Sequence, residues 1–263
     1  MLSPVSIRHA FVLLLLLSMA VVAQAQVSDL NSAINKAGRQ RMLSQRMAKA
    51  YFQIGLGVDV DRSRKVLDGS VALFDRQLAE LKAFAPSPEI RETYQKLERT
   101  WQGYRQALTA AAPNQADGAR ILALSDEVLA LAQKGTQQLE NRSTTSSARL
   151  VNLAGRQRML SQRMAKFFQA AVWKIGVEQA APEIEKARRE FATALQELAA
   201  APSNTPALRE ELELVRQQWL FFESALSQLG SNDKRQATVV ATTSERILET
   251  MESVVGQYEK QTR

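Results

Sequence analysis

Two arginines, Arg41 and Arg158, have the chemistry to bind a ligand. They hold the same place in a block, AGRQRMLSQRMAK, that occurs unchanged at residues 37–49 and 154–166. A guanidinium is a planar fork of N–H donors that keeps its charge at ordinary pH, so it suits the oxygens of carboxylate, nitrate or phosphate. If such a charge is buried, something must neutralise it, because an unpaired buried charge is strongly destabilising.

The stretches around the two blocks contain no acidic residue. None occurs between Asp29 and Asp59, and none between Glu140 and Glu178. Basic residues are frequent in both stretches: Lys36, Arg39, Arg41, Arg46 and Lys49 in the first, and Arg149, Arg156, Arg158, Arg163, Lys166 and Lys174 in the second. The sequence around each block therefore supplies positive charge without its own counter-charge.

Helical geometry separates these basic residues into two groups. At about 100° per residue, one stripe of the first block is mainly apolar; it comprises Leu30, Ile34, Ala37, Gly38, Arg41, Gln45, Ala48 and Phe52. We expect Arg39, Arg46 and Lys49 to lie at its flank and to be solvated. For Arg41 and Arg158 two alternatives stay open, a bound anion or an ion pair with a carboxylate of the second or fourth helix of the module.

The same helix is predicted to bury two faces, because Leu43 and Met47 point away from the stripe. Gly38 has no side chain and would let a second helix or a small ligand approach the backbone. Its cost in helix propensity, roughly 1 kcal/mol relative to alanine, suggests that it has a purpose. The candidate ligand-binding residues are Gly38, Arg41 and Gln45, with their equivalents Gly155, Arg158 and Gln162.

The identity of the two blocks extends into a longer internal repeat. The same offset pairs Phe74 with Phe191, and one inserted residue later Trp101 matches Trp219. Such self-similarity indicates two tandem copies of one structural unit. We expect modules at 26–144 and 145–263, with both tryptophans in their cores.

Each module is predicted to contain four amphipathic helices, from apolar spacings of three and four and from breakers at matching places. In the first module the expected helices cover 29–53, 61–84 and 88–111 and begin again near 117. In the second, the expected boundaries are Gly176 with Pro182, Thr205-Pro206, and Gly230 to Asp233. Short connections between amphipathic helices predict antiparallel four-helix bundles, so the expected fold is all-α.

The junction of the modules allows two topologies. Residues 119–175 contain no proline and no strong turn dipeptide, which favours one long continuous helix from about 117 to 175. The alternative is a break near Thr144 to Ser147, which would let the two block-bearing helices lie side by side in one chain as a pseudo-dimer.

The amino-terminus and the composition limit the function. Residues 1–25 have an apolar run and end in Ala23-Gln24-Ala25, which indicates a signal peptide and export to the periplasm; an uncleaved anchor is the alternative. Beyond them the chain has no cysteine and no histidine, which excludes disulfides, thiol and histidine catalysis and Cys/His metal sites. We therefore expect no enzyme, cofactor or metal, and export argues against nucleic acid as a partner despite the net charge of +7.

The segments INKAGRQRMLSQRMAK at 34–49 and VNLAGRQRMLSQRMAK at 151–166 resemble the PilJ-type sensor domain of type IV pilus chemotaxis transducers. That domain is similar to the periplasmic nitrate and nitrite sensing domain of bacterial sensor kinases. There, two first helices of four-helix bundles meet across a dimer interface and hold the anion between their arginines. The resemblance implies nitrate or nitrite as ligand, with Arg41 and Arg158 as the ligand arginines.

The resemblance also implies a partner. Relatives of this kind continue into a membrane helix and a signalling region, whereas this sequence stops at Arg263. We expect a periplasmic sensor-type module that recognises a small anion and acts with a membrane-bound sensor or chemoreceptor, and that can form a homodimer. The alternative is a helical interaction or scaffold protein, without a small-molecule ligand, whose arginines answer carboxylates of a membrane or chemoreceptor partner.

Overall fold

The computed structural model describes residues 29–144, 146–230 and 233–261, and all its regular elements there are α-helices. The predicted all-α class with two tandem helical modules is confirmed. The predicted signal peptide lies outside the described residues. The helices of the first module are α2 (Leu30–Leu56), α3 (Val60–Phe84), α4 (Pro88–Thr109) and α5 (Gln115–Glu140); those of the second are α6 (Ser146–Val172), α7 (Val177–Ala199), α8 (Pro206–Leu226) and α9 (Lys234–Lys260).

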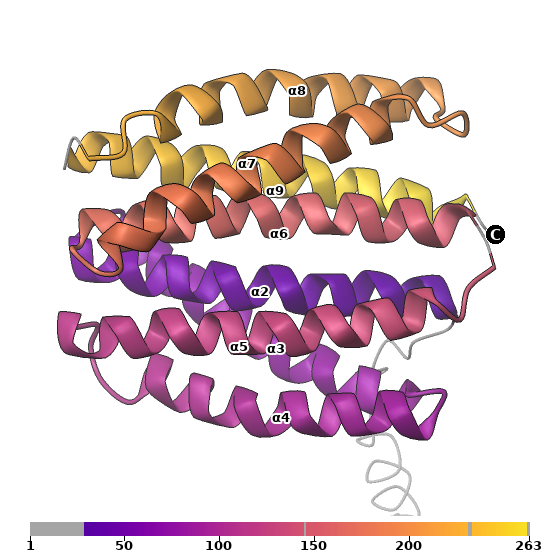
Figure 1. The fold of residues 1–263 in the computed structure, drawn as a ribbon, viewed down its shortest axis with the longest axis horizontal. Coiled ribbons are helices and arrows are strands. Elements are labelled where there is room, and N and C mark those ends of the chain that lie inside the picture. Colours follow the sequence, from indigo (N-terminus) through magenta and orange to yellow (C-terminus); the bar gives the residue numbers. More distant parts are fainter. Residues whose placement is uncertain (1–28, 145, 231–232, 262–263) are drawn as a thin grey trace, which may run out of the picture.

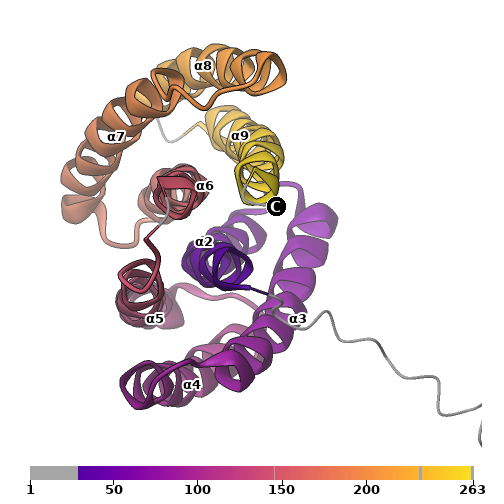
Figure 2. The same ribbon diagram turned by 90° about the vertical axis from the view of Figure 1, so that its right-hand side faces the viewer.

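The two modules lie side by side with their long axes aligned (Figure 1). Viewed end-on, α2 and α6 occupy the centre, with α3, α4 and α5 on one side and α7, α8 and α9 on the other (Figure 2). The central pair is parallel: Asn31 contacts Ser147 near the start of both helices, and Phe52 packs against Trp173 at the opposite end. The two copies of the repeated block therefore face each other within one chain.

The predicted continuous helix between the modules is wrong. Helix α5 ends at Glu140 and α6 begins at Ser146. The last turn of α5 tightens, with the N–H of Arg142 donating to Leu139 at 3.1 Å and that of Ser143 to Glu140 at 2.8 Å. Serine and threonine after this turn compete for backbone hydrogen bonds, and the break allows α6 to pack along α2. The pseudo-dimer topology, left open by the sequence, is the one observed.

Most helices begin and end at the predicted capping and helix-breaking residues. Ser87 accepts a hydrogen bond from the N–H of Ile90, and Thr205 caps α8 in the same way. Gly57 ends α2 with φ of 72°, a left-handed conformation that glycine adopts without strain. Pro182 was expected to separate two helices, but it lies inside α7, because Gly176 with φ of 58° already makes the turn.

The core contains the predicted aromatic residues. Trp101 stacks on Phe74 at 4.1 Å between ring centroids, and Trp219 stacks on Phe191 at 4.4 Å. Both tryptophans are buried, as are the four methionines of the repeated blocks. Helix α2 is buried on both faces, as predicted, because it contacts its own bundle and α6.

Over the described residues, none of the helices combines the length and the apolarity needed to cross a lipid bilayer.

Candidate functional site

The two arginines and the two glycines of the repeated blocks meet where α2 contacts α6. A Cβ atom placed on Gly38 would lie 3.1 Å from Nη2 of Arg41 and 3.6 Å from Nη2 of Arg158. At Gly155 the same two nitrogens lie at 3.6 and 3.1 Å, in the reverse order. Both arginine side chains are fully buried. Two like charges thus lie over bare backbone in the middle of the molecule.

Arg41 is held by neutral groups. Its Nη1 donates to Oε1 of Gln133 on α5 at 2.7 Å, and its Nη2 donates to Oδ1 of Asn152 on α6, also at 2.7 Å. The nearest acid acts through an intermediary, because the amide nitrogen of Asn152 donates to the carboxylate of Glu140. The Nε of Arg41 is buried and has no hydrogen-bond partner among the described residues.

Arg158 has nearly the same surroundings with one difference. Its Nη2 donates to Oδ1 of Asn35 at 2.9 Å, and Asn35 in turn donates to Glu259 at 2.6 Å. Its Nη1, however, forms an ion pair with the carboxylate of Glu252 on α9, which Arg39 also contacts. Arg158 thus forms a salt bridge to a carboxylate of the fourth helix of its module, one of the two kinds of partner considered from the sequence.

The electrostatics of the pair is unfavourable. The pKa of Arg41 is lowered to about 9, chiefly by burial; the nearby charge of Arg156 contributes to this fall, and Glu140 opposes it. Burial also lowers the pKa of Arg158, with Arg39 and Arg41 adding to the effect. Low dielectric penalises the charged form of each group, and two cations in one place repel each other. An anion between them would relieve both costs.

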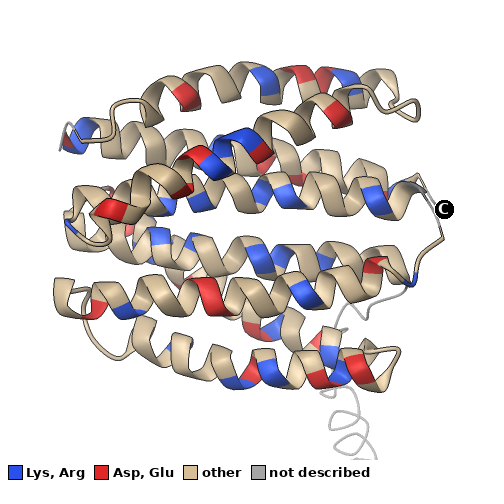
Figure 3. Ribbon diagram, viewed as in Figure 1, with Lys and Arg blue, Asp and Glu red and all other residues tan. Residues whose placement is uncertain are grey.

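The other basic residues of the blocks find acids on the surrounding helices. Figure 3 shows Lys and Arg on α2 and α6, with Asp and Glu on the helices around them. The pairs are Arg39–Glu252, Arg46–Glu245, Lys49–Glu245, Arg156–Glu190, Arg163–Asp126, Arg163–Glu183 and Lys166–Asp126. The expectation that the flanking side chains are solvated is wrong, most clearly for Lys49, which is 1% exposed. The acids are distant in sequence, so the local absence of acidic residues did not reveal them.

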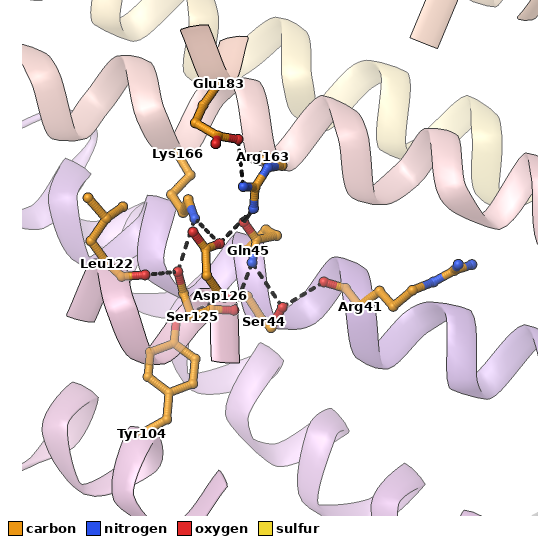
Figure 4. Close-up of polar contacts among 10 residues, drawn as sticks. All are labelled: Arg41, Ser44, Gln45, Tyr104, Leu122, Ser125, Asp126, Arg163, Lys166 and Glu183. Atoms are coloured by element: carbon orange, nitrogen blue, oxygen red, sulfur yellow. Dashed lines mark hydrogen bonds and ion pairs between the residues drawn. The ribbon is translucent and has the colours of Figure 1, made fainter. Parts of the chain in front are cut away.

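The buried lysines reach across the module boundary. Lys166 on α6 donates to Asp126 on α5 at 2.7 Å, and Arg163 contacts the same carboxylate (Figure 4). In the mirrored arrangement, Lys49 on α2 pairs with Glu245 on α9. Burial lowers the pKa of Lys166 to about 7 and that of Lys49 to about 8, against the attraction of their carboxylates. These pairs bind the two bundles together.

The candidate glutamines lie one turn away from the arginine pair. Gln45 donates to the backbone carbonyl of Ser125 at 2.9 Å, and Gln162 donates to that of Ser244 at the same distance. Figure 4 shows Gln45 facing Ser125, whereas the guanidinium of Arg41 points the other way. Of the predicted site residues, the structure brings the glycines and arginines together. The glutamines lie elsewhere and form hydrogen bonds between helices, Gln45 from α2 to α5 and Gln162 from α6 to α9.

Four contact residues were missed by sequence reasoning: Asn35, Asn152, Gln133 and Glu252. The asparagines were visible as a matched pair next to the blocks. Gln133 and Glu252 are also equivalent, at the offset of 119 that holds near the module ends, so an aligned repeat would have found them and their difference in charge.

Across the described residues, Arg41 is the one cation of the two blocks whose contacts include no carboxylate. The described part of the chain also has no cluster of acidic, histidine or cysteine side chains that could hold a metal ion. The site thus combines buried positive charge with the Nε donor of Arg41, which has no partner among the described residues.

The described helices thus form two bundles that meet along α2 and α6, with the paired arginines between these central helices. The family model described as the N-terminal domain of type IV pili methyl-accepting chemotaxis transducers, PilJ, matches residues 22–126 and 140–245. The chain belongs to this family, with two copies of its domain. Membership places it among signalling modules, a non-enzymatic class.

One chemotaxis protein is similar in sequence to part of this chain. The methyl-accepting chemotaxis protein McpN of Pseudomonas aeruginosa is 37% identical over 87 residues, which cover 30% of this chain and 16% of McpN. The likeness thus concerns a small part of that protein's length. No solved structure matches the chain.

Proposed function

We propose that this chain is a sensor module that binds one small oxyanion, nitrate or nitrite by resemblance, between Arg41 and Arg158. The observation that carries the proposal is the buried guanidinium of Arg41. It is held by Gln133 and Asn152, and no carboxylate among the described residues contacts it. A buried cation without a counter-ion is destabilising, and a planar oxyanion matches its fork of donors.

The glycines support the same conclusion. Both Nη2 atoms lie within 3.6 Å of the point where a Cβ would stand on Gly38, and equally at Gly155. The absence of a side chain at these two points keeps the backbone open beside both guanidiniums. Modest shifts of flexible arginine ends would admit an ion of three or four atoms. One chain supplies both halves of the site, because α2 and α6 are parallel neighbours.

Calorimetry with the purified chain tests the proposal. We expect nitrate or nitrite to bind the wild type, and binding to weaken at least a hundredfold in the double variant Arg41→Ala, Arg158→Ala. Arg64→Ala, at an exposed position on α3, is the matched control and keeps the affinity. Because ligand that binds only the folded state stabilises it by about 2.7 kcal/mol at a hundred times Kd, the anion should also raise the Tm of the wild type.

A second variant guards against misfolding of the alanine variant. Arg41→Lys keeps the charge but loses the planar fork, so it should fold and lose preference for planar oxyanions over chloride. No heat and no Tm change with nitrate, nitrite, sulfate or phosphate would overturn the proposal. That outcome would favour the alternative, a helical interaction module that docks on a membrane or chemoreceptor partner.

We further propose that the module works in the periplasm and reports to a membrane-bound signalling partner. The support is the signal peptide predicted at residues 1–25 and the family description as the N-terminal domain of a chemotaxis transducer. Alkaline phosphatase, active only after export, can be fused behind residue 263. We expect activity that requires residues 1–25; equal activity without them would contradict the assignment.

A further inference from the structure

The hydrogen bonds of the two arginines are matched except for one partner. Nη2 of each donates to an asparagine Oδ1 and to that asparagine's carbonyl, the latter at 3.4 Å in both halves. Nη1 of Arg41 meets the amide of Gln133, and Nη1 of Arg158 meets the carboxylate of Glu252. Gln133 and Glu252 are equivalent in the repeat and nearly equal in size. The site is therefore symmetric in shape and asymmetric in charge.

This difference decides where an anion gains most. The hydrogen bond from Arg41 to the amide of Gln133 has one charged partner, the guanidinium. An anion in place of that amide makes both partners charged and adds the attraction between opposite charges. An anion that approaches Arg158 finds its donors already engaged by Glu252 and is repelled by that carboxylate. The Arg41 half is thus the favoured half.

The route from solvent also favours the Arg41 half of the site. A groove of about 270 Å³ runs along α5, α6 and α7. Gln133 lines it, together with three basic side chains (Arg156, Arg163 and Lys186) and two acidic ones (Asp126 and Glu190), among others. Gln133 lines this groove and also accepts the hydrogen bond from Nη1 of Arg41. On the opposite side, Glu252 is anchored by Arg39 as well as by Arg158. Arg156 and Arg163 pair with Glu190 and Asp126 of the groove lining. The charged side chains of the groove therefore leave a net positive charge of one, which favours anions near Gln133 only weakly.

We propose that Glu252 is a built-in counter-anion that makes the site one-sided, so that a single small oxyanion enters beside Gln133 and binds Arg41. This inference rests on the proposed function and adds which half takes the ligand and what sets its affinity. Glu252 neutralises Arg158 permanently. The external anion does for Arg41 what Glu252 does for Arg158.

Two reciprocal substitutions test the inference by calorimetry with nitrate and nitrite. Glu252→Gln removes the internal anion, and we expect the affinity to rise about tenfold or more, since two uncompensated guanidiniums then face the ligand. Gln133→Glu gives Arg41 its own carboxylate, and we expect the affinity to fall at least tenfold. The matched controls are the exposed Glu249→Gln on α9 and Gln137→Glu on α5, which make the same charge changes and should leave the affinity within twofold.

Melting temperatures provide a second readout if Glu252→Gln folds poorly. That variant should melt below the wild type in salt-free buffer and regain more than the wild type when nitrate is added, whereas Gln133→Glu should melt higher and ignore nitrate. If both variants bind like the wild type while Arg41→Ala abolishes binding, the inference is wrong and the proposed function stands. If neither the wild type nor any variant binds an anion, both are wrong.

Discussion

Lys49 and Lys166 hold the same position in identical blocks, yet their carboxylate partners differ. Lys49 pairs with Glu245, whose side chain is 7% exposed, and Lys166 pairs with Asp126, whose side chain is 37% exposed. The two acids are themselves equivalent in the repeat. The partners of Arg41 and Arg158 also differ: Arg41 contacts the amide of Gln133, and Arg158 contacts the carboxylate of Glu252. Identical sequences thus receive different electrostatics from the helices that surround them.

The comparison shows where the molecule has diverged. The blocks on the central helices α2 and α6 are identical, whereas their partner residues on the outer helices α5 and α9 differ. Water screens the more exposed pair and leaves the buried pair unscreened. We therefore expect perturbations of the Glu245 half to have larger effects on stability than those of the Asp126 half.

The largest expected effect is that of Glu245→Gln. This change leaves the buried Lys49 and the nearby Arg46 without their carboxylate, and removing one partner of a buried pair costs about 3–5 kcal/mol. Asp126→Asn should cost less, because that carboxylate is more exposed. Urea unfolding monitored by circular dichroism measures both, with the exposed Glu249→Gln as control. Equal losses for the two variants would show that the difference in burial has no energetic weight.

The second largest effect is expected in the loss of folding stability at low pH, to which the carboxylate of Glu245 contributes. Burial raises the pKa of Glu245, but Lys49 and Arg46 outweigh it and lower the pKa from 4.5 to about 2. A carboxylate whose folded pKa is depressed stabilises the fold above its unfolded pKa and loses this contribution as pH falls. Between about pH 4.5 and 2 the wild type should lose on the order of 3 kcal/mol through this group. Glu245→Gln should lack that part of the slope in urea titrations at each pH.

A smaller effect is expected at the aromatic end of the α2–α6 contact. A Cβ on Gly55 would lie 2.2 Å from the ring of Trp173, so Gly55→Ala forces the ring or the helix to move, at about 1–3 kcal/mol. Gly256→Ala on α9 is the control, because a Cβ there meets nothing within 4 Å, and it should gain up to about 1 kcal/mol of helix propensity. Thermal melts measure both changes; a stabilised Gly55→Ala would contradict the close packing.

Much of the fold followed from local signals. Helix ends at Gly57, Ser87-Pro88 and Thr205-Pro206 depend on backbone chemistry that a single sequence displays. The break between α5 and α6 could not be predicted from local signals, because it occurs at serine and threonine residues, which a helix also tolerates. The packing of α6 along α2 decides between the two outcomes, and that packing joins residues more than a hundred positions apart.

The site was predictable in part for the same reason. The apolar stripe correctly placed Arg41 and Arg158 inside the protein, where both are fully buried. The stripe could not give their partners, because Gln133 and Glu252 belong to other helices, 92 and 94 positions further along. Periodicity tells which way a side chain points, and only the tertiary arrangement tells what it meets.

The short connection from Glu140 to Ser146 determines how the paired helices respond to dilution. Separate one-module chains would have to associate, and the fraction assembled would fall as their concentration fell. Here the second helix is tethered beside the first at an effective concentration on the order of millimolar. The proposed anion site between these helices should therefore respond to the same anion concentration whether a cell makes a few copies of the chain or thousands.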